Sequence, residues 1–193
     1  MKRIYDKAYD KAVLDSEIIQ EMESAKHRDP DFDINWRDRR DTWSLSLLMC
    51  AVYRNREEFV EYLLKDPNIN VNYKVNTDAA LHFACDNNNI LKLLLGHKDI
   101  DVNIQNGCGD TVLHNACMGY SIENVKELLL DARINILICG KDEDEDRDGV
   151  TAMDLAILWN FDNIAKIIWN SRYTPLLRIL CYDIARMIIE EYV

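Results

Sequence analysis

Apolar residues recur along the chain in short blocks with helical spacing, and the blocks come in pairs. The second block of each pair repeats apolar residues at the intervals typical of a helix with one buried face. These blocks lie at residues 59–64, 90–95, 124–129 and 164–168, and each follows a shorter block, at residues 44–51, 78–85, 110–117 and 149–156. Extended segments such as Ile69-Asn-Val-Asn72 come after the second block. The pattern predicts a unit of helix, turn, helix and extended loop.

The unit recurs at a nearly constant interval. Ala51, Ala84 and Ala116 occupy corresponding positions near the ends of the shorter blocks and are separated by 33 and 32 residues, and Ala156 follows after 40 more. A unit of this size cannot bury its apolar face alone, so copies stack on one another. We therefore predict an all-α solenoid, with an insertion at residues 141–149 in the last copy.

One motif carries a family resemblance. Thr111-Val-Leu-His-Asn-Ala116 and, less completely, Asp78-Ala-Ala-Leu-His-Phe-Ala-Cys85 resemble the T-P-L-H-x-A signature of the ankyrin repeat. The resemblance covers roughly residues 30–170. It implies that His82 and His114 hydrogen-bond the backbone and tie neighbouring repeats together. Met49 and Asp154 replace this histidine in the first and last copies, where we expect weaker ties.

The repeats divide the chain into six predicted parts. These are an N-terminal capping half-repeat at 1–35, ankyrin repeats at 36–72, 73–103, 104–136 and 137–170, and a C-terminal helix at 171–193. Residues 3–27 are expected to form one capping helix, because terminal repeats need a polar outer face. Five residues separate Ala84 from Ile90, against seven between Ala51 and Phe59, which predicts a shortened turn at residues 86–89.

Charge and composition narrow the choice of partner. The formal net charge of −11 disfavours nucleic acid and anionic lipid, both of which are bound through clustered Lys and Arg. No apolar run approaches the roughly 20 residues of a membrane-spanning helix. The N-terminus lacks the apolar stretch of a secretory signal. We therefore expect a soluble, intracellular, cytoplasmic protein. Its six cysteines lack C-x-x-C spacing, which favours small buried side chains over a zinc site.

Signatures of catalysis and of cofactor binding are missing from the sequence. There is no glycine-rich phosphate loop, and the four histidines form no recognisable motif with a cysteine or serine. Asp144, Asp146, Asp148 and Gly149 fit the opening of a calcium-binding EF-hand loop, but Leu155 stands where that loop needs a glutamate. We expect a non-catalytic protein without a cofactor, and a solvated acidic loop rather than a metal site.

The C-terminal segment admits two interpretations. Leu177, Cys181 and Ala185 have the spacing of an elongin C-binding box, and residues 180–193 resemble the first helix of the F-box-like PRANC motif. Both resemblances imply recruitment of a cullin-type ubiquitin ligase, through elongin C or a cullin adaptor. A plain amphipathic capping helix explains the same periodicity. A substrate adaptor of such a ligase is therefore the alternative function.

The family resemblance implies that a partner protein binds to the loop tips and to the exposed face of the first helices. The candidate residues are Trp36, Arg37, Arg40 and Trp43 on the first tip, Tyr73, Lys74 and Asn76 on the second, and Tyr53, Asp86 and Met118 on first helices. Tryptophan, tyrosine and arginine dominate the energetics of protein interfaces. The tryptophans could equally cover the end of the core. The predicted function is non-catalytic binding of a protein whose identity the sequence leaves open.

Overall fold

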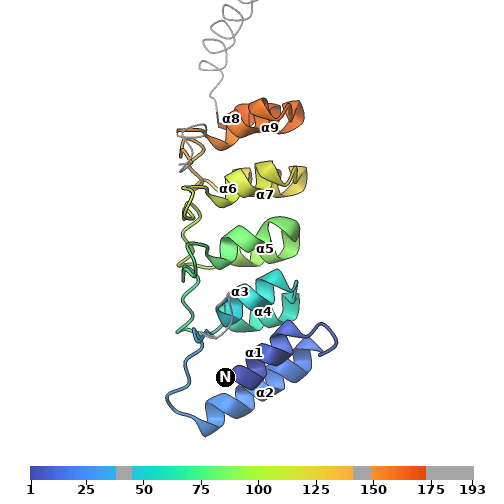
Figure 1. The fold of residues 1–193 in the computed structure, drawn as a ribbon, viewed down its shortest axis with the longest axis vertical. Coiled ribbons are helices and arrows are strands. Elements are labelled where there is room, and N and C mark those ends of the chain that lie inside the picture. Colours follow the sequence, from blue (N-terminus) through green and yellow to red (C-terminus); the bar gives the residue numbers. More distant parts are fainter. Residues whose placement is uncertain (38–44, 141–148, 173–193) are drawn as a thin grey trace, which may run out of the picture.

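The computed structural model describes residues 1–37, 45–140 and 149–172. Its helices are α1 (Lys2–Tyr9), α2 (Asp15–Arg28), α3 (Leu47–Tyr53), α4 (Glu57–Leu64), the 3₁₀ helix η1 (Ala80–Asp86), α5 (Asn88–Leu95), α6 (Val112–Met118), α7 (Ile122–Leu130), α8 (Ala152–Leu158) and α9 (Asp162–Arg172). Figure 1 shows them as antiparallel pairs stacked in one column, with the connecting loops along one side. The predicted all-α solenoid is confirmed.

The column has two layers of helices. The first helices pack in the order α1, α3, η1, α6 and α8, and the second helices in the order α2, α4, α5, α7 and α9 (Figure 1). We call α3 with α4 the first repeat, η1 with α5 the second, α6 with α7 the third, and α8 with α9 the fourth. Because every pair packs only on its neighbours, contacts along the column are local.

Small side chains let the first helices approach closely. Ala51, Ala84, Ala116 and Ala156 are all fully buried, each in the first helix of its repeat. A larger side chain at these positions would separate the stacked helices, since interiors of this kind are close-packed.

The single helix expected over residues 3–27 is wrong. The chain forms two helices, α1 and α2, and this pair stacks on α3 and α4 as a further repeat would. The buried guanidinium of Arg56 holds the loop between them: its Nε donates to the carbonyl of Ala8 at 2.6 Å and its Nη1 to that of Val13 at 2.8 Å. The same Nη1 also pairs with Asp15 at 2.7 Å. Arg56 lies more than 40 residues from the loop that it binds. The apolar spacing within residues 3–27 therefore does not show that the chain breaks there into two helices.

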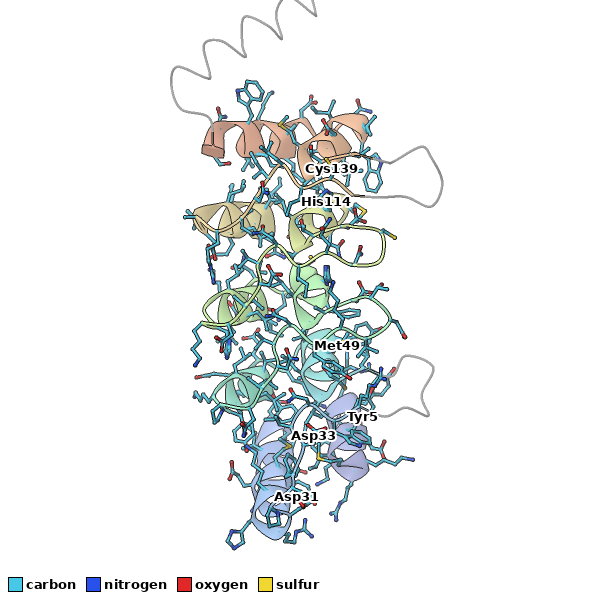
Figure 2. All side chains as sticks on the ribbon, turned by 90° about the vertical axis from the view of Figure 1, so that its left-hand side faces the viewer. Tyr5, Asp31, Asp33, Met49, His114 and Cys139 are labelled. Carbon is cyan, nitrogen blue, oxygen red and sulfur yellow. The ribbon has the colours of Figure 1, made fainter. Side chains whose placement is uncertain are left out.

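The two histidines act as predicted. His82 Nδ1 accepts from the Ala79 N–H at 3.0 Å, so its Nε2 carries the proton and donates to the Ile104 carbonyl of the next loop at 3.1 Å. His114 Nδ1 lies 3.2 Å from the Thr111 nitrogen, and its Nε2 lies 3.3 Å from the Val150 oxygen. Figure 2 shows His114 between the helices of the third and fourth repeats.

Where the histidine is replaced, the hydrogen bonds of the replacing residue stay within its own repeat. Met49 is buried within α3, and its N–H donates to Ser46 Oγ at 3.2 Å. The Asp154 carboxylate accepts from the Thr151 N–H at 2.9 Å and from its hydroxyl at 2.6 Å, which caps α8. The predicted weakness of the ties at both ends stays a prediction.

Asparagines join the loops on the other side of the column. Asn72 donates to the Asp99 carbonyl at 2.7 Å and accepts from the Asp101 N–H at 2.9 Å. Asn103 makes the same pair of bonds to Arg133 and Asn135, each at 2.8 Å. Asn72 and Asn103 therefore link the loops of successive repeats through matching pairs of hydrogen bonds.

Candidate functional site

A hollow opens on the face formed by the first helices of three successive repeats. Its volume is about 360 Å³, and residues from all three repeats line it: Val52, Tyr53, Asn55, His82, Phe83, Cys85, Asn115 and Met118. Two predicted binding residues, Tyr53 on α3 and Met118 on α6, meet here although they are far apart in the sequence. His82, Phe83 and Cys85 lie between them on η1, a helix from which the sequence had singled out Asp86 alone for binding.

The hollow lies where the second repeat lacks a turn. In the first, third and fourth repeats, three residues join the two helices, and the central one has a positive φ: Asn55 at 58°, Tyr120 at 53° and Asn160 at 59°. In the second repeat, Asn87 alone separates η1 from α5. The shortened turn expected at residues 86–89 is thus confined to one residue, because η1 runs to residue 86 as a 3₁₀ helix.

The shortened turn is held by its own asparagine and by the first repeat. The Asn87 side chain caps α5 by accepting from the N–H groups of Asn89 at 3.0 Å and Ile90 at 3.2 Å. The Glu57 carboxylate accepts from the side-chain amide of Asn87 at 3.0 Å and from that of Asn89 at 3.1 Å. These bonds cap α5 and link the shortened turn to the first repeat.

The third repeat supplies the other support. Asn124 is buried on α7, and its amide donates to the main-chain carbonyl of Cys85 at the end of η1. Its oxygen accepts from Asn88 Nδ2 at 2.9 Å. A buried carbonyl without a donor would cost about 1–3 kcal/mol, so this polar side chain stabilises the shortened repeat.

Aromatic rings and a thioether dominate the open wall of the hollow. The Tyr53 side chain is half exposed and meets Phe83 edge to face, with the ring centroids 6.2 Å apart. Beside Tyr53, the guanidinium of Arg54 stacks 3.5 Å over the Tyr9 ring. Burial lowers the pKa of His82, which keeps this imidazole neutral. The lining therefore combines apolar side chains with the polar groups of Asn55, His82 and Asn115.

The cysteines at the repeat position behave as small apolar side chains. Cys117 is buried, and desolvation raises the pKa of its thiol to about 12. Its counterpart Cys85 is half-buried at the hollow, with Sγ 3.6 Å from the Val112 carbonyl oxygen. A protonated thiol is a weak nucleophile, so the burial and the raised pKa of Cys117 favour a structural role for this side chain.

The predicted loop-tip residues that the structure describes are not among the residues that line the hollow. Trp36 is half-buried and packs edge to face on the buried ring of Tyr5, 5.9 Å between centroids. Lys74 donates to the Gln105 carbonyl on the next loop at 2.6 Å. Asn76 is exposed with φ 48° at a loop tip, next to the half-buried Tyr73. Trp36 and Lys74 thus stabilise the fold, and their part in binding stays a prediction.

Several candidate residues cannot be placed. Arg37 is half-buried and pairs with Ser46 in an isolated β-bridge. Those outside the described residues are Arg40, Trp43, Asp144, Asp146, Asp148, Leu177, Cys181 and Ala185, together with the side chain of Asp86. Gly149 is described, with φ 83°. Leu155, which would occupy the closing position of a calcium loop, is buried in α8.

Two further findings concern the described part of the chain. Within residues 1–37, 45–140 and 149–172, no group of three or more His, Cys, Asp or Glu side chains could hold a metal ion. None of the helices placed in these ranges has the length and apolar character needed to cross a membrane.

Comparison with known proteins agrees with the repeat geometry. A family model described as ankyrin repeats (3 copies) matches residues 15–106 and again residues 88–176. The chain belongs to the ankyrin-repeat family. Ankyrin repeats are generally protein–protein interaction modules, and the family is typically non-catalytic. The resemblance predicted from the T-P-L-H-x-A motif is confirmed.

A curated relative shows how far the similarity extends. The chain is similar to transient receptor potential cation channel subfamily A member 1 of Homo sapiens, with 36% identity over 94 residues. The match covers 46% of this chain and 8% of the channel. The chain therefore spans a small fraction of that relative's length.

The sequence missed Phe83 and Cys85 as parts of a binding surface. Both lie next to the motif alanine Ala84, where a structural role explains them. The short interval between Ala84 and Ile90 was the available signal. It marks the position of the hollow but not its lining.

Proposed function

We propose that this ankyrin-repeat chain is a non-catalytic module that binds a partner protein through its loop tips and concave face. The observation that carries the proposal is the hollow of about 360 Å³ between α3, η1 and α6. Three repeats contribute to it, so a single partner would contact several repeats at once, as solenoid binding surfaces do.

The chemistry of the hollow supports a protein ligand. Tyr53 is 53% exposed, although it is a large side chain in van der Waals reach of another aromatic ring. Exposed aromatic and methionine side chains grouped in a recess mark interaction sites, and tyrosine is among the residues whose loss most weakens protein interfaces.

Affinity capture from a cell lysate tests the proposal. The full chain is compared with the variants Tyr53→Ser and Met118→Ser, and bound proteins are quantified by mass spectrometry. Each variant is expected to retain at least about tenfold less of the partner, because it removes an apolar anchor. The matched control is Leu130→Ser, which removes a side chain 79% exposed on α7, away from the hollow. Equal loss in the control, or no specific partner, would contradict the proposal.

The same experiment addresses the alternative of a ubiquitin-ligase adaptor. Recovery of elongin C or a cullin adaptor, and its loss on Leu177→Asp, would support that role. The residues concerned lie outside the described part of the chain, so the support for this alternative is the sequence pattern alone.

A further inference from the structure

We infer that the guanidinium of Arg54, beside the hollow between α3, η1 and α6, binds a side-chain carboxylate of the partner protein. This inference rests on the proposed function and gives the chemistry of one contact in that interface. It follows from three features of Arg54: the stacking of its side chain, the lack of an acceptor for its donors, and its contact with the wall of the hollow.

Two tyrosine rings lie against the guanidinium of Arg54. Its Cζ is 3.5 Å from the centroid of the Tyr9 ring and 5.5 Å from that of the Tyr53 ring. Tyr9 ends α1 and Tyr53 ends α3, two helices that pack on each other (Figure 1). Stacking on a ring uses the flat face of a guanidinium and leaves the N–H groups in its plane available. The Tyr9 ring therefore restrains Arg54 without using its hydrogen-bond donors.

Arg54 and Arg56 differ in how their donors are used. The Arg56 guanidinium donates to the carbonyls of Ala8 and Val13 and pairs with Asp15. In the part of the chain that the structure describes, Arg54 Nε is buried without a hydrogen-bond acceptor, and the guanidinium forms no ion pair. A buried donor without an acceptor is unfavourable, and more so on a charged group. An acceptor supplied by a partner removes this penalty.

A carboxylate suits these donors better than a neutral group does. Arginine and a carboxylate form two parallel N–H···O bonds, and such charge-assisted bonds are roughly twice as strong as neutral ones. The hollow beside Arg54 has no acidic side chain in its lining, and burial keeps His82 neutral there. Glu57, the described carboxylate closest to Arg54 in the sequence, accepts from the side-chain amides of Asn87 and Asn89. The charge complementary to Arg54 is therefore left for a partner to supply.

The position of Arg54 joins this carboxylate site to the hollow. Tyr53, whose ring lies beside the guanidinium, also lines the hollow and meets Phe83 of the next repeat with the ring centroids 6.2 Å apart. Asn55, which follows Arg54 in the sequence, lines the hollow as well. One segment of a partner can therefore place a neutral side chain in the hollow and the carboxylate of a nearby residue on Arg54.

Selection from a library of short random peptides displayed on phage tests the inference with the full chain. The selected peptides are then synthesised with an amidated C-terminus, so that only their side chains carry carboxylates. They are expected to share an aspartate or glutamate, and replacing it by asparagine or glutamine should weaken binding at least about tenfold. The affinity should also fall as the salt concentration rises. A consensus without an acidic residue would overturn the inference.

A variant of Arg54 shows whether the carboxylate binds at this residue. Arg54→Gln should weaken the acidic peptide at least about tenfold, whereas the neutral form of the peptide should bind Arg54→Gln and the wild type equally. Arg28→Gln is the matched control, because it removes the same charge from a side chain that is 69% exposed on α2. This control should bind as the wild type does. An equal loss in both variants would assign the effect to net charge and overturn the inference.

Charge reversal separates binding from a structural role of Arg54 in stacking on Tyr9. Arg54→Glu should bind a peptide whose acidic residue is replaced by lysine at least about tenfold better than the acidic peptide. A structural role does not depend on the sign of the peptide charge, so the absence of this reversal would overturn the inference. If circular dichroism shows that Arg54→Glu is misfolded, Arg54→Lys is compared with Arg54→Gln. The lysine variant should then retain more affinity, and equal affinity would overturn the inference.

The outcomes distinguish failure of this inference from failure of the proposed function. If capture from the lysate depends on Tyr53 and Met118 but not on Arg54, the proposed function survives and the inference fails. If no protein and no peptide binds the full chain, both fail.

Discussion

The second and third repeats share the same motif but end their first helices in different ways. In the third repeat, α6 runs into a three-residue turn, and the Tyr120 N–H donates to the Cys117 carbonyl at 3.0 Å. In the second repeat, that turn is missing, and the corresponding carbonyl of Cys85 takes the amide of Asn124 from α7. The hydrogen-bond donor for a main-chain carbonyl of the second repeat is thus a side chain of the third repeat.

This difference explains a polar residue in the core. Phe59, Ile90 and Ile164 occupy equivalent positions at the start of the second helices, and all are fully buried. Asn124 stands at that position in the third repeat and is also buried. The polar side chain has a partner there, because the main-chain carbonyl of Cys85 in the neighbouring second repeat accepts a hydrogen bond from its amide. The shortened turn of the second repeat and the buried asparagine of the third repeat are therefore structurally coupled.

The largest expected effect comes from moving the asparagine. Ile164→Asn places the same side chain in the fourth repeat, where the Cys117 carbonyl is already bonded to Tyr120. The loss of a buried isoleucine and the burial of an unpaired amide should reduce the free energy of unfolding by at least about 3 kcal/mol. Urea denaturation followed by circular dichroism measures this change. A loss below about 1 kcal/mol would mean that the position tolerates asparagine in any repeat.

The reverse change should be smaller but still destabilising. Asn124→Leu restores the apolar residue type of the other repeats, yet leaves the Cys85 carbonyl and the Asn88 amide without their partner. We expect a loss of about 1–3 kcal/mol in the same denaturation assay. Greater stability in this variant would show that the asparagine does not compensate for the missing turn.

The two repeats should respond alike to acid, because both bury a neutral histidine. Burial lowers the pKa of His82 and of His114, so near neutral pH the unfolded chain binds more protons than the folded chain. Their stabilising contribution is fully present above the unfolded pKa of about 6.5 and is lost as the pH falls through the lower folded pKa.

Thermal unfolding at a series of pH values between about 7 and 5 tests this expectation. The midpoint should fall with pH in the wild type and fall less steeply in the variant His82→Gln/His114→Gln. Identical slopes in both proteins would assign the pH dependence to other groups.

The smallest expected loss of stability comes from the asparagines that join the loops on the other side of the column. Asn72→Ala removes the bonds that join the first and second repeats, and Asn103→Ala removes those that join the second and third. Each should cost about 0.5–1.5 kcal/mol, and the two costs should be equal. The exposed Asn68 is the control, because only its main chain bonds Asn35. A clear difference between Asn72 and Asn103 would show that the shortened repeat also alters the loop layer.

The sequence by itself determined the repeat, its interval and the roles of the motif residues. Helical periodicity, the alanines and the two histidines are local or strictly periodic signals, and the structure confirms the solenoid and the histidine bonds they predicted. The spacing between Ala84 and Ile90 also located the shortened turn. Tyr53 and Met118 could be chosen as exposed positions on first helices, but the residues between them could not.

Tertiary structure alone decided three features: the break between α1 and α2, the hollow and the place of Asn124. The break and the place of Asn124 each depend on a side chain meeting a main-chain group more than 30 residues away: Arg56 with Ala8, and Asn124 with Cys85. The hollow depends on residues that three repeats bring together. Periodicity reports which face of a helix is buried, but it does not report which carbonyl lacks a donor. The bond becomes visible only when the repeats are stacked, because the second repeat provides the Cys85 carbonyl and the third repeat provides the Asn124 amide that donates to it.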